Sequence, residues 1–286
     1  MKKYLKLIRI KHWLKNGLIF FPLVFGGCLF DANLFAKVCI GFFAFSLSAS
    51  AIYIINDILD IENDRRHATK RNRPLASGAI SVRSARLTCG LILVGVVALN
   101  FLVAADNLLM WSVLALYIVI NFTYSMGLKN VALLDIFILV LGYILRIYYG
   151  GLIAGIEVSS WLYLTVVSMA FFLGLGKRRN EMKTQEVETR KVLKQYNTSF
   201  LEKNMYMCLG LTIAFYSLWC QSIVESRETP FILLTIPLVF TICMKYSLNV
   251  EGNSDGDPVE VVFSDKALLL LMGVYACMMF VILYVT

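Results

Sequence analysis

Apolar stretches that approach the thickness of a lipid bilayer recur along the whole chain, and they limit its fold more than any other feature. Of the 286 residues, 59% are apolar and 16% are charged, whereas a soluble domain carries about 25% charged residues. A transmembrane helix needs about 20 mostly apolar residues, so the shorter stretches must extend into their polar flanks. The stretches are residues 17–30, 34–55, 87–105, 108–122, 131–154, 161–176, 205–224, 231–244 and 267–285. The pattern predicts an all-α polytopic membrane protein, with about nine transmembrane helices in one bundle and a single domain over residues 1–286.

Lysine and arginine are distributed unevenly between the connecting segments, which sets the expected orientation. With the N-terminus placed in the cytoplasm, 24 of the 27 basic residues fall on the cytoplasmic side, as the positive-inside rule requires. An odd number of spans then places the C-terminus outside. This distribution accounts for the net charge of +8 without a nucleic-acid partner. It also predicts that a cavity for a charged substrate faces the cytoplasm.

Three segments are expected outside the bilayer core. Residues 1–16 mix lysine and arginine with apolar and aromatic side chains, which is typical of an interfacial amphipathic helix. Residues 56–86 and 177–204 are expected to form charged cytoplasmic loops. The seven cysteines are scattered, nearly all in apolar stretches and without a CxxC pair, so we expect neither a disulfide nor a cysteine metal site.

A group of acidic and amide side chains directly follows the second apolar stretch. Its members are Asn56, Asp57, Asp60 and Asp64. If the helix continues past the stretch, this spacing places their oxygens on one face. Carboxylates on one face repel each other unless a cation lies between them, and a few hard oxygen ligands suit Mg²⁺ that also binds substrate phosphate. The group therefore predicts a Mg²⁺ site, with Asn56 and Asp60 as first ligands and Asp57 and Asp64 in support. The alternative is a solvated loop of mixed charge.

Basic residues near the ends of the apolar stretches are the expected phosphate ligands. Lys70 and Arg71 follow the acidic group, in reach of a diphosphate. Asp135 and Arg146 lie three helical turns apart, about 16 Å along the helix axis. A guanidinium near the middle of a membrane is costly and normally faces a cavity, with a structural ion pair as the alternative. Other cations at the mouths of stretches are Lys15, Lys177 and Arg178.

The spacing Asn56-Asp57-x-x-Asp60-x-x-x-Asp64 resembles the first Asp-rich motif of the UbiA-like intramembrane prenyltransferase superfamily, whose nine-helix bundle matches the number of apolar stretches. Pieces through most of the chain resemble its decaprenyl-phosphate phosphoribosyltransferase branch. These pieces are Trp13-Leu14-Lys15-Asn16, residues 56–74, residues 124–129 with Asp135, Arg146, residues 177–181, and Gly256-Asp257-Pro258. Aromatic prenyltransferases generally carry a second Asp-rich cluster on a later loop. Here the matching loops hold Asp135 and otherwise bases, which favours the branch whose substrates carry more phosphate.

The resemblance implies a Mg²⁺-dependent enzyme of the bacterial cytoplasmic (inner) membrane. It would transfer the 5-phosphoribosyl group from phosphoribosyl pyrophosphate to a polyprenyl phosphate, release diphosphate, and serve the synthesis of cell-envelope glycan (arabinan) precursors. The implied catalytic residues are Asn56, Asp57, Asp60 and Lys129. The implied substrate-binding residues are Lys15, Tyr53, Lys70, Arg71, Tyr124, Lys129, Asp135, Arg146, Lys177 and Arg178. The lipid chain would lie in an apolar groove open to the bilayer, and a homo-oligomer is compatible with the sequence.

Two other functions remain open at this point. An aromatic-acid polyprenyltransferase would share the metal–diphosphate chemistry but would require the second acidic cluster. A secondary transporter would explain Asp135 and Arg146 within a span. Transporters tend to show internal repeats with spans broken at matched positions, and we find no clear repeat in this chain. A transporter also gives no reason for four acidic or amide groups on one cytoplasmic face.

Overall fold

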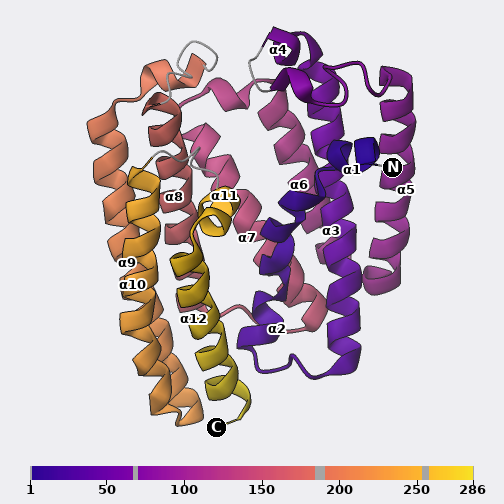
Figure 1. Ribbon diagram of the computed structural model, residues 1–286. Coiled ribbons are helices and arrows are strands. Elements are labelled where there is room, and N and C mark those ends of the chain that lie inside the picture. The colour runs from indigo at the N-terminus through magenta and orange to yellow at the C-terminus, as the bar shows by residue number, and fades with distance from the viewer. Residues whose placement is uncertain (1, 67–69, 184–190, 253–257, 286) are drawn as a thin grey trace. The chain divides into compact units, whose positions relative to one another are not determined.

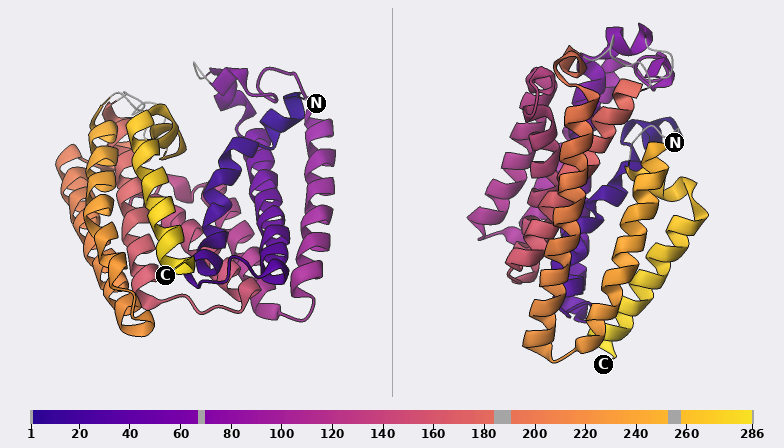
Figure 2. Two further views of the ribbon diagram at one scale, coloured as in Figure 1. Left: turned by 60° about the horizontal axis from the view of Figure 1, so that its bottom comes forward. Right: turned by 90° about the vertical axis from the view of Figure 1, so that its left-hand side faces the viewer.

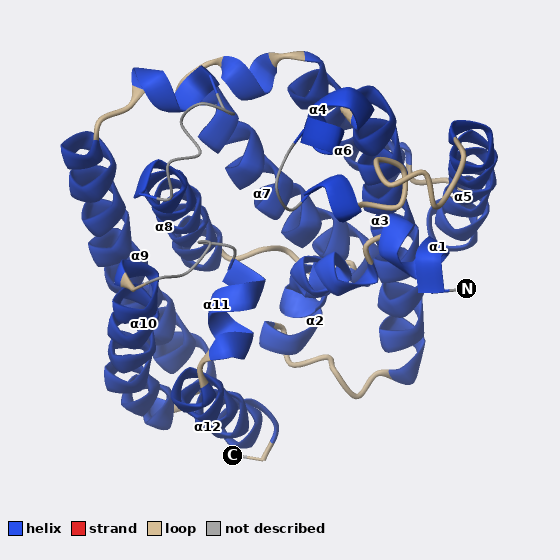
Figure 3. Ribbon diagram, turned by 45° about the horizontal axis from the view of Figure 1, so that its top comes forward, coloured by secondary structure: helices blue, strands red, loops and turns tan. Residues whose placement is uncertain are grey.

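The computed structural model describes residues 2–66, 70–183, 191–252 and 258–285. These residues form helices and connecting turns, and no strand occurs among them (Figure 3). The chain divides into two compact units. The first comprises Met1–Met126 and Leu145–Glu157, and the second comprises Gly127–Ile144 and Val158–Thr286. The predicted all-α class is confirmed, while the single domain expected for residues 1–286 stays a prediction.

The first unit is built around its longest helix, α3. In chain order its elements are α1 (Lys2–Leu7), η1 (Ile10–Phe20), α2 (Phe21–Phe25), α3 (Ala32–Leu59), α4 (Ile61–Arg66), η2 (Lys70–Asn72), α5 (Val82–Ala104), α6 (Leu108–Met126) and the second half of α7 (Leu134–Ala154). Helices η1, α5 and α6 all pack against α3 (Figure 1). Helix α3 therefore contacts elements that precede it and elements that follow it in the chain.

The second unit begins inside the turn between α6 and α7 and continues from the end of α7 to the C-terminus. Its elements are η3 (Leu128–Asn130), the first half of α7, α8 (Ser160–Lys183), η5 (Lys191–Gln195), α9 (Thr198–Arg227), η6 (Pro230–Leu234), α10 (Thr235–Glu251), α11 (Pro258–Ser264) and α12 (Lys266–Tyr284). Helices α8 and α9 lie side by side, as do α10 and α12 (Figure 2). Ile136, Phe172 and Met205 are nearly or fully buried in its apolar core.

Eight helical stretches in the described part are long and apolar enough to cross a membrane. They are Ala32–Leu59, Val82–Ala104, Leu108–Met126, Leu134–Ala154, Ser160–Lys183, Thr198–Arg227, Pro230–Glu251 and Lys266–Tyr284. Each corresponds to one of the predicted stretches. The remaining stretch, residues 17–30, forms the end of η1 and the short α2, because Pro22 lies in the first turn of α2 and Gly27 (φ 79°) follows its end. The structure confirms a polytopic helical protein, and the count of nine stays a prediction.

Local side chains explain where several long helices begin. Asp31, Ser81 and Asn197 precede α3, α5 and α9, and each side chain accepts a hydrogen bond from a backbone N–H of the first turn. These caps satisfy donors that a helix start leaves unpaired. Helix α8 continues through Lys177 to Lys183, because residues 177–183 contain no glycine or proline, so the charged segment 177–204 is partly helical.

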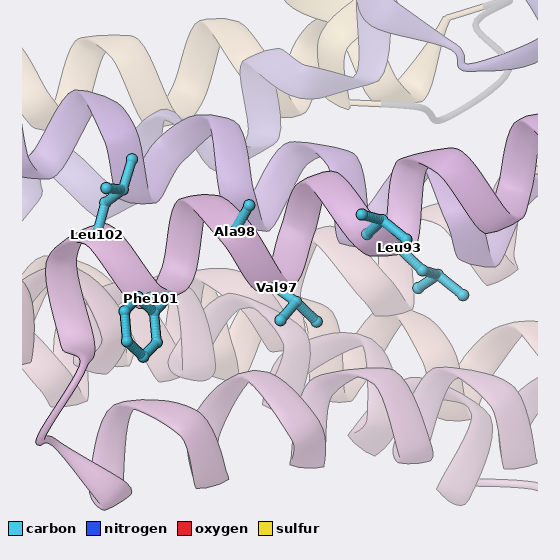
Figure 4. Close-up of a pocket in the computed structure, with 6 residues that line it drawn as sticks. Leu93, Val97, Ala98, Phe101 and Leu102 are labelled. Carbon is cyan, nitrogen blue, oxygen red and sulfur yellow. The ribbon is translucent and has the colours of Figure 1, made fainter.

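Some predicted features fall outside the described residues, and one surface is plainly not a site. Gly256 and Asp257 of the last motif lie outside the described part of the chain. A shallow apolar depression on α5 is lined by residues of that helix alone, among them Leu93, Val97 and Phe101 (Figure 4). Because it holds no charged group, we assign it to the lipid-facing side of the helix.

Candidate functional site

The predicted metal ligands lie where α3 passes into α4. The backbone N–H of Asp60 donates to the carbonyl of Asn56 at 2.9 Å, and the N–H of Asp64 donates to the carbonyl of Asp60 at 2.8 Å. Helical hydrogen bonding therefore continues across the break between the two helices, and Asn56, Asp60 and Asp64 follow one another by single turns on one side. Asp57 and Asp64 are 2% and 4% exposed, whereas Asn56 and Asp60 are half-buried.

Two arginines that the sequence analysis did not assign to the site pair with these carboxylates. Arg73 donates from Nη1 to Asp57 Oδ1 at 3.2 Å and to Asp64 Oδ2 at 2.8 Å. Arg9 donates from Nη2 to Asp57 Oδ1, and its guanidinium lies 4.7 Å from the centre of the Tyr53 ring. Asp57 is thus held between two cations, and Arg73 joins two carboxylates that lie two turns apart.

The donor set fits Mg²⁺ better than a metal enclosed by protein. Among the described residues, no three His, Cys, Asp or Glu side chains gather into a group that could hold a metal ion. Asn56 and Asp60 carry hard oxygen atoms one helical turn apart, and Asp57 and Asp64 belong to the same segment, where α3 passes into α4. Mg²⁺ is usually bound through one or two carboxylates together with waters and substrate phosphates. This arrangement suits such shared binding.

Helix η1 follows α3 in the opposite direction, and polar contacts join the two. Trp13 Nε1 donates to Ser50 Oγ at 3.0 Å, and Asn16 Nδ2 donates to Ser46 Oγ at 2.9 Å. The rings of His12 and Tyr53 are 5.6 Å apart. Lys15 and Tyr53 are half-buried along this seam, which therefore leads from the acidic group into the membrane-spanning part of the first unit.

Arg146 lies at the far end of the same seam. Its Nε donates to Asn16 Oδ1 at 2.7 Å, and its Nη2 donates to the Tyr117 hydroxyl at 3.2 Å. The guanidinium is 5.1 Å from the ring centres of both Phe45 and Tyr117. Arg146 is 8% exposed, so an amide, a phenol and two aromatic faces fix a cation within the helical bundle of this unit. Other predicted phosphate ligands of the first unit differ in exposure, since Lys70 and Tyr124 are half-buried and Arg71 is exposed.

The remaining predicted residues belong to the second unit, where two of them form a buried ion pair. Arg178 donates from Nε to Asp135 Oδ2 at 2.5 Å and from Nη1 to Glu181 Oε2 at 2.8 Å. The Tyr196 hydroxyl donates to Asp135 Oδ1 at 2.6 Å. Asp135 is 0% exposed and Arg178 is 1% exposed. Both carboxylate oxygens of Asp135 are therefore engaged by protein groups.

Lys129 and Lys177 of the second unit are half-buried on η3 and α8. Direct substrate contact by Asp135 and Arg178 stays a prediction, but the structure gives each a buried protein partner. The sequence analysis missed Tyr196 and assigned no role to Glu181. The three-residue spacing of Arg178 and Glu181 on one helix was the available signal, and no local pattern marks Tyr196, which is 61 residues from Asp135.

The sequence of most of the chain is similar to a known protein family. The sequence model of the UbiA prenyltransferase family matches residues 19–264. The chain is 33% identical, over 93% of its length and 88% of the relative's, to a decaprenyl-phosphate phosphoribosyltransferase of Mycolicibacterium smegmatis. It is 34% identical, over 93% of its length and 82% of the relative's, to the protein of that name from Corynebacterium glutamicum.

Solved structures agree with the sequence comparison at the level of the fold. A UbiA homologue from Archaeoglobus fulgidus bound to GPP and Mg²⁺ superimposes with a TM-score of 0.71 at 22% identity, covering 98% of this chain and 99% of the other. The same homologue bound to DMAPP and Mg²⁺ gives a TM-score of 0.72 at 21% identity. The family match covers well over half of the chain, so this protein belongs to the UbiA prenyltransferase family.

Proposed function

We propose that this protein transfers the 5-phosphoribosyl group from phosphoribosyl pyrophosphate to a polyprenyl phosphate in a Mg²⁺-dependent reaction that releases diphosphate. The observation that carries the proposal is the 33% and 34% identity, over 93% of the chain, to two proteins named decaprenyl-phosphate phosphoribosyltransferase. The acidic group, the surrounding arginines and buried Arg146 supply the charge pattern that two phosphate-bearing substrates require.

The reaction exchanges one bond at C1 of the ribose. The bond from C1 to the diphosphate oxygen breaks, and a bond forms from C1 to an oxygen of the acceptor phosphate. The acceptor phosphate is already ionised at neutral pH, so the enzyme needs no strong general base. Catalysis then depends on positioning and on stabilising the diphosphate as C1 gains oxocarbenium character.

The acidic group would hold the metal and the leaving diphosphate. Asn56 and Asp60 are the proposed Mg²⁺ ligands, with Asp57 and Asp64 in support. When bound, Mg²⁺ would supply the positive charge that makes diphosphate a better leaving group. Arg9 and Arg73 keep Asp57 and Asp64 in place. Because Arg73 is 29% exposed and joins both carboxylates, it also lies at the accessible edge of the group.

The cations outside the acidic group would bind the substrate phosphates. Lys15, Tyr53, Lys70 and Lys129 are the proposed ligands of the phosphoribosyl donor. Arg146 would bind a phosphate within the bundle, since its guanidinium is already oriented by Asn16 and Tyr117. The polyprenyl chain would remain in the apolar part of the membrane, where a helical bundle can expose a groove to it.

The proposed setting is a bacterial cytoplasmic membrane, with the N-terminus and the acidic group on the cytoplasmic side. There the protein would meet phosphoribosyl pyrophosphate, which is soluble and highly charged. The product, a lipid-linked phosphoribose, would serve as a precursor of cell-envelope glycan such as arabinan.

A direct assay tests the proposal. Purified protein in detergent is mixed with a polyprenyl phosphate, Mg²⁺ and phosphoribosyl pyrophosphate labelled in the ribose, and label is followed into the organic phase. We expect transfer that EDTA abolishes and that added Mg²⁺ restores. No transfer to lipids of several lengths, with prenylation of an aromatic acid in a parallel assay, would overturn the proposal in favour of an aromatic prenyltransferase.

A further inference from the structure

The turn between α6 and α7, which carries Lys129, has an unusual backbone. Gly127 has a φ of 156°, and Leu133 has a φ of 67° although it is not glycine. A bulky residue in the left-handed region costs about 1–3 kcal/mol and persists only where the surrounding structure imposes it.

A segment more than 60 residues later in the chain makes those contacts. The backbone N–H of Leu133 donates to the hydroxyl of Tyr196 at 2.6 Å. The side chain of Gln195 donates from Nε2 to the carbonyl of Asn130 at 3.1 Å. Helix η3, which includes Lys129, packs against η5, which ends at Gln195. Two consecutive residues thus bind the middle of the strained turn, at Asn130, and its end, at Leu133.

The Tyr196 hydroxyl is itself fixed by the buried ion pair. It accepts from Leu133, so it must donate its own proton to Asp135 Oδ1, and Asp135 is held from the other side by Arg178. Burial and the hydrogen bond to Asp135 raise the pKa of Tyr196 above its ordinary value, which keeps this proton in place. Phenylalanine would fill the space but would leave both bonds unmade.

We propose that Tyr196, assisted by Gln195, is a positioning residue that holds the Asn130–Leu133 turn and thereby sets Lys129 for the phosphate-bearing donor. Asp135 and Arg178, which are both buried, support the Tyr196 hydroxyl from within the protein. The inference rests on the proposed function, because it takes Lys129 as a ligand of phosphoribosyl pyrophosphate. The left-handed conformation of Leu133 lowers the stability of the protein. Accurate placement of Lys129 explains why the turn keeps this conformation.

A double-mutant cycle tests the role of Tyr196 in the full-length protein. The variants are Tyr196→Phe, Lys129→Ala and the two combined. A matched control is Tyr206→Phe, which removes a hydroxyl bonded to Glu251 at 2.6 Å elsewhere in the same unit. We expect Tyr196→Phe to raise the KM for phosphoribosyl pyrophosphate about tenfold with little change in kcat, because both hydrogen bonds of the hydroxyl are lost and the turn is held less firmly. When Lys129 is already alanine, Tyr196→Phe should not raise the KM further, because the residue that Tyr196 positions is absent.

Amide hydrogen exchange supplies a second readout that does not depend on activity. Tyr196→Phe should speed exchange in residues 130–135, whereas Tyr206→Phe should not. Additive effects on KM, or unchanged exchange in the turn, would overturn the positioning role while leaving the proposed function intact. Absence of phosphoribosyl transfer by the unaltered protein would instead overturn the proposed function, and with it this role for Lys129.

Discussion

Arg73 is the residue that joins two carboxylates of the acidic group. Its Nη1 bonds to both Asp57 and Asp64, which are almost completely buried. We expect Arg73→Gln to lower the free energy of unfolding by about 1–3 kcal/mol, because buried Asp64 loses the cation that binds it and Asp57 is left with Arg9 alone. Thermal unfolding in detergent measures the effect.

A second substitution separates this explanation from simple loss of packing. Adding Asp64→Asn to Arg73→Gln removes the uncompensated charge and should restore part of the lost stability. Arg71→Gln, at an exposed position two residues away, should leave the unfolding temperature nearly unchanged. An equal loss from Arg71→Gln, or no recovery in the double variant, would contradict the role given to Arg73.

Asp60 carries the main prediction for catalysis. We expect Asp60→Ala to reduce phosphoribosyl transfer at least about 100-fold, as for removal of one preorganised electrostatic group, while the protein remains folded. The control is Glu62→Ala, because Glu62 is exposed and pairs with exposed Arg65. Normal transfer by Asp60→Ala would remove Asp60 from the metal site.

Local spacing made part of the candidate site predictable. The acidic group could be recognised because Asn56, Asp60 and Asp64 recur at the four-residue spacing of a helix, and Arg146 because a charge inside an apolar stretch is conspicuous. The contacts of Arg9, Asn16 and Tyr196 could not be predicted in this way. Arg9 is 48 residues from Asp57, and Asn16 is 130 residues from Arg146. Only the packing of distant helices brings such pairs together.

At the level of elements, η1 is the least predictable from the sequence. The interfacial position of residues 1–16 stays a prediction, and the described residues form a short α1, a left-handed Arg9 (φ 52°) and then an 11-residue 3₁₀ helix. Runs of 3₁₀ helix longer than three or four residues are uncommon and often mark strain or function. The polar contacts with α3 and the close approach to α7 both depend on this element, and neither leaves a periodic pattern in the sequence.

The approach of η1 to α7 leads to a prediction at Gly150. A Cβ atom added there would lie 2.0 Å from the carbonyl oxygen of Ile19, a backbone atom that cannot move without η1. We therefore expect Gly150→Ala to destabilise the protein by about 1–3 kcal/mol and to weaken activity, because Asn16 and Arg146 lie on the two displaced elements. Gly90→Ala is the matched control, since a Cβ at Gly90 meets nothing within 4 Å. Equal thermal stability of the two variants would contradict this prediction and would show that η1 can shift away from α7 at little energetic cost.

For the molecule as a whole, the membrane-spanning helices were predictable because each requires a long apolar stretch, which a sequence displays directly. Eight helices satisfy that requirement in the described part of the chain. The division into two compact units was not predictable. It passes through α7, whose first half belongs to one unit and second half to the other, and a continuous apolar helix shows no sign of such a boundary.

The stretch from Ile10 to Phe25 determines the topology of the whole chain, because it decides whether the number of crossings is odd or even. If η1 and α2 together cross the membrane, nine crossings place the termini on opposite sides; if they do not, eight crossings place both on one side. The six basic residues before Gly17 and the eight between Lys177 and Lys203 favour the cytoplasm for both segments, which requires the crossing. We therefore expect a reporter active only in the cytoplasm to work at the N-terminus and after Lys129 but to fail at the C-terminus, where a reporter active only outside should work. Cytoplasmic activity at both termini would mean that Ile10–Phe25 enters the membrane and returns to the same side.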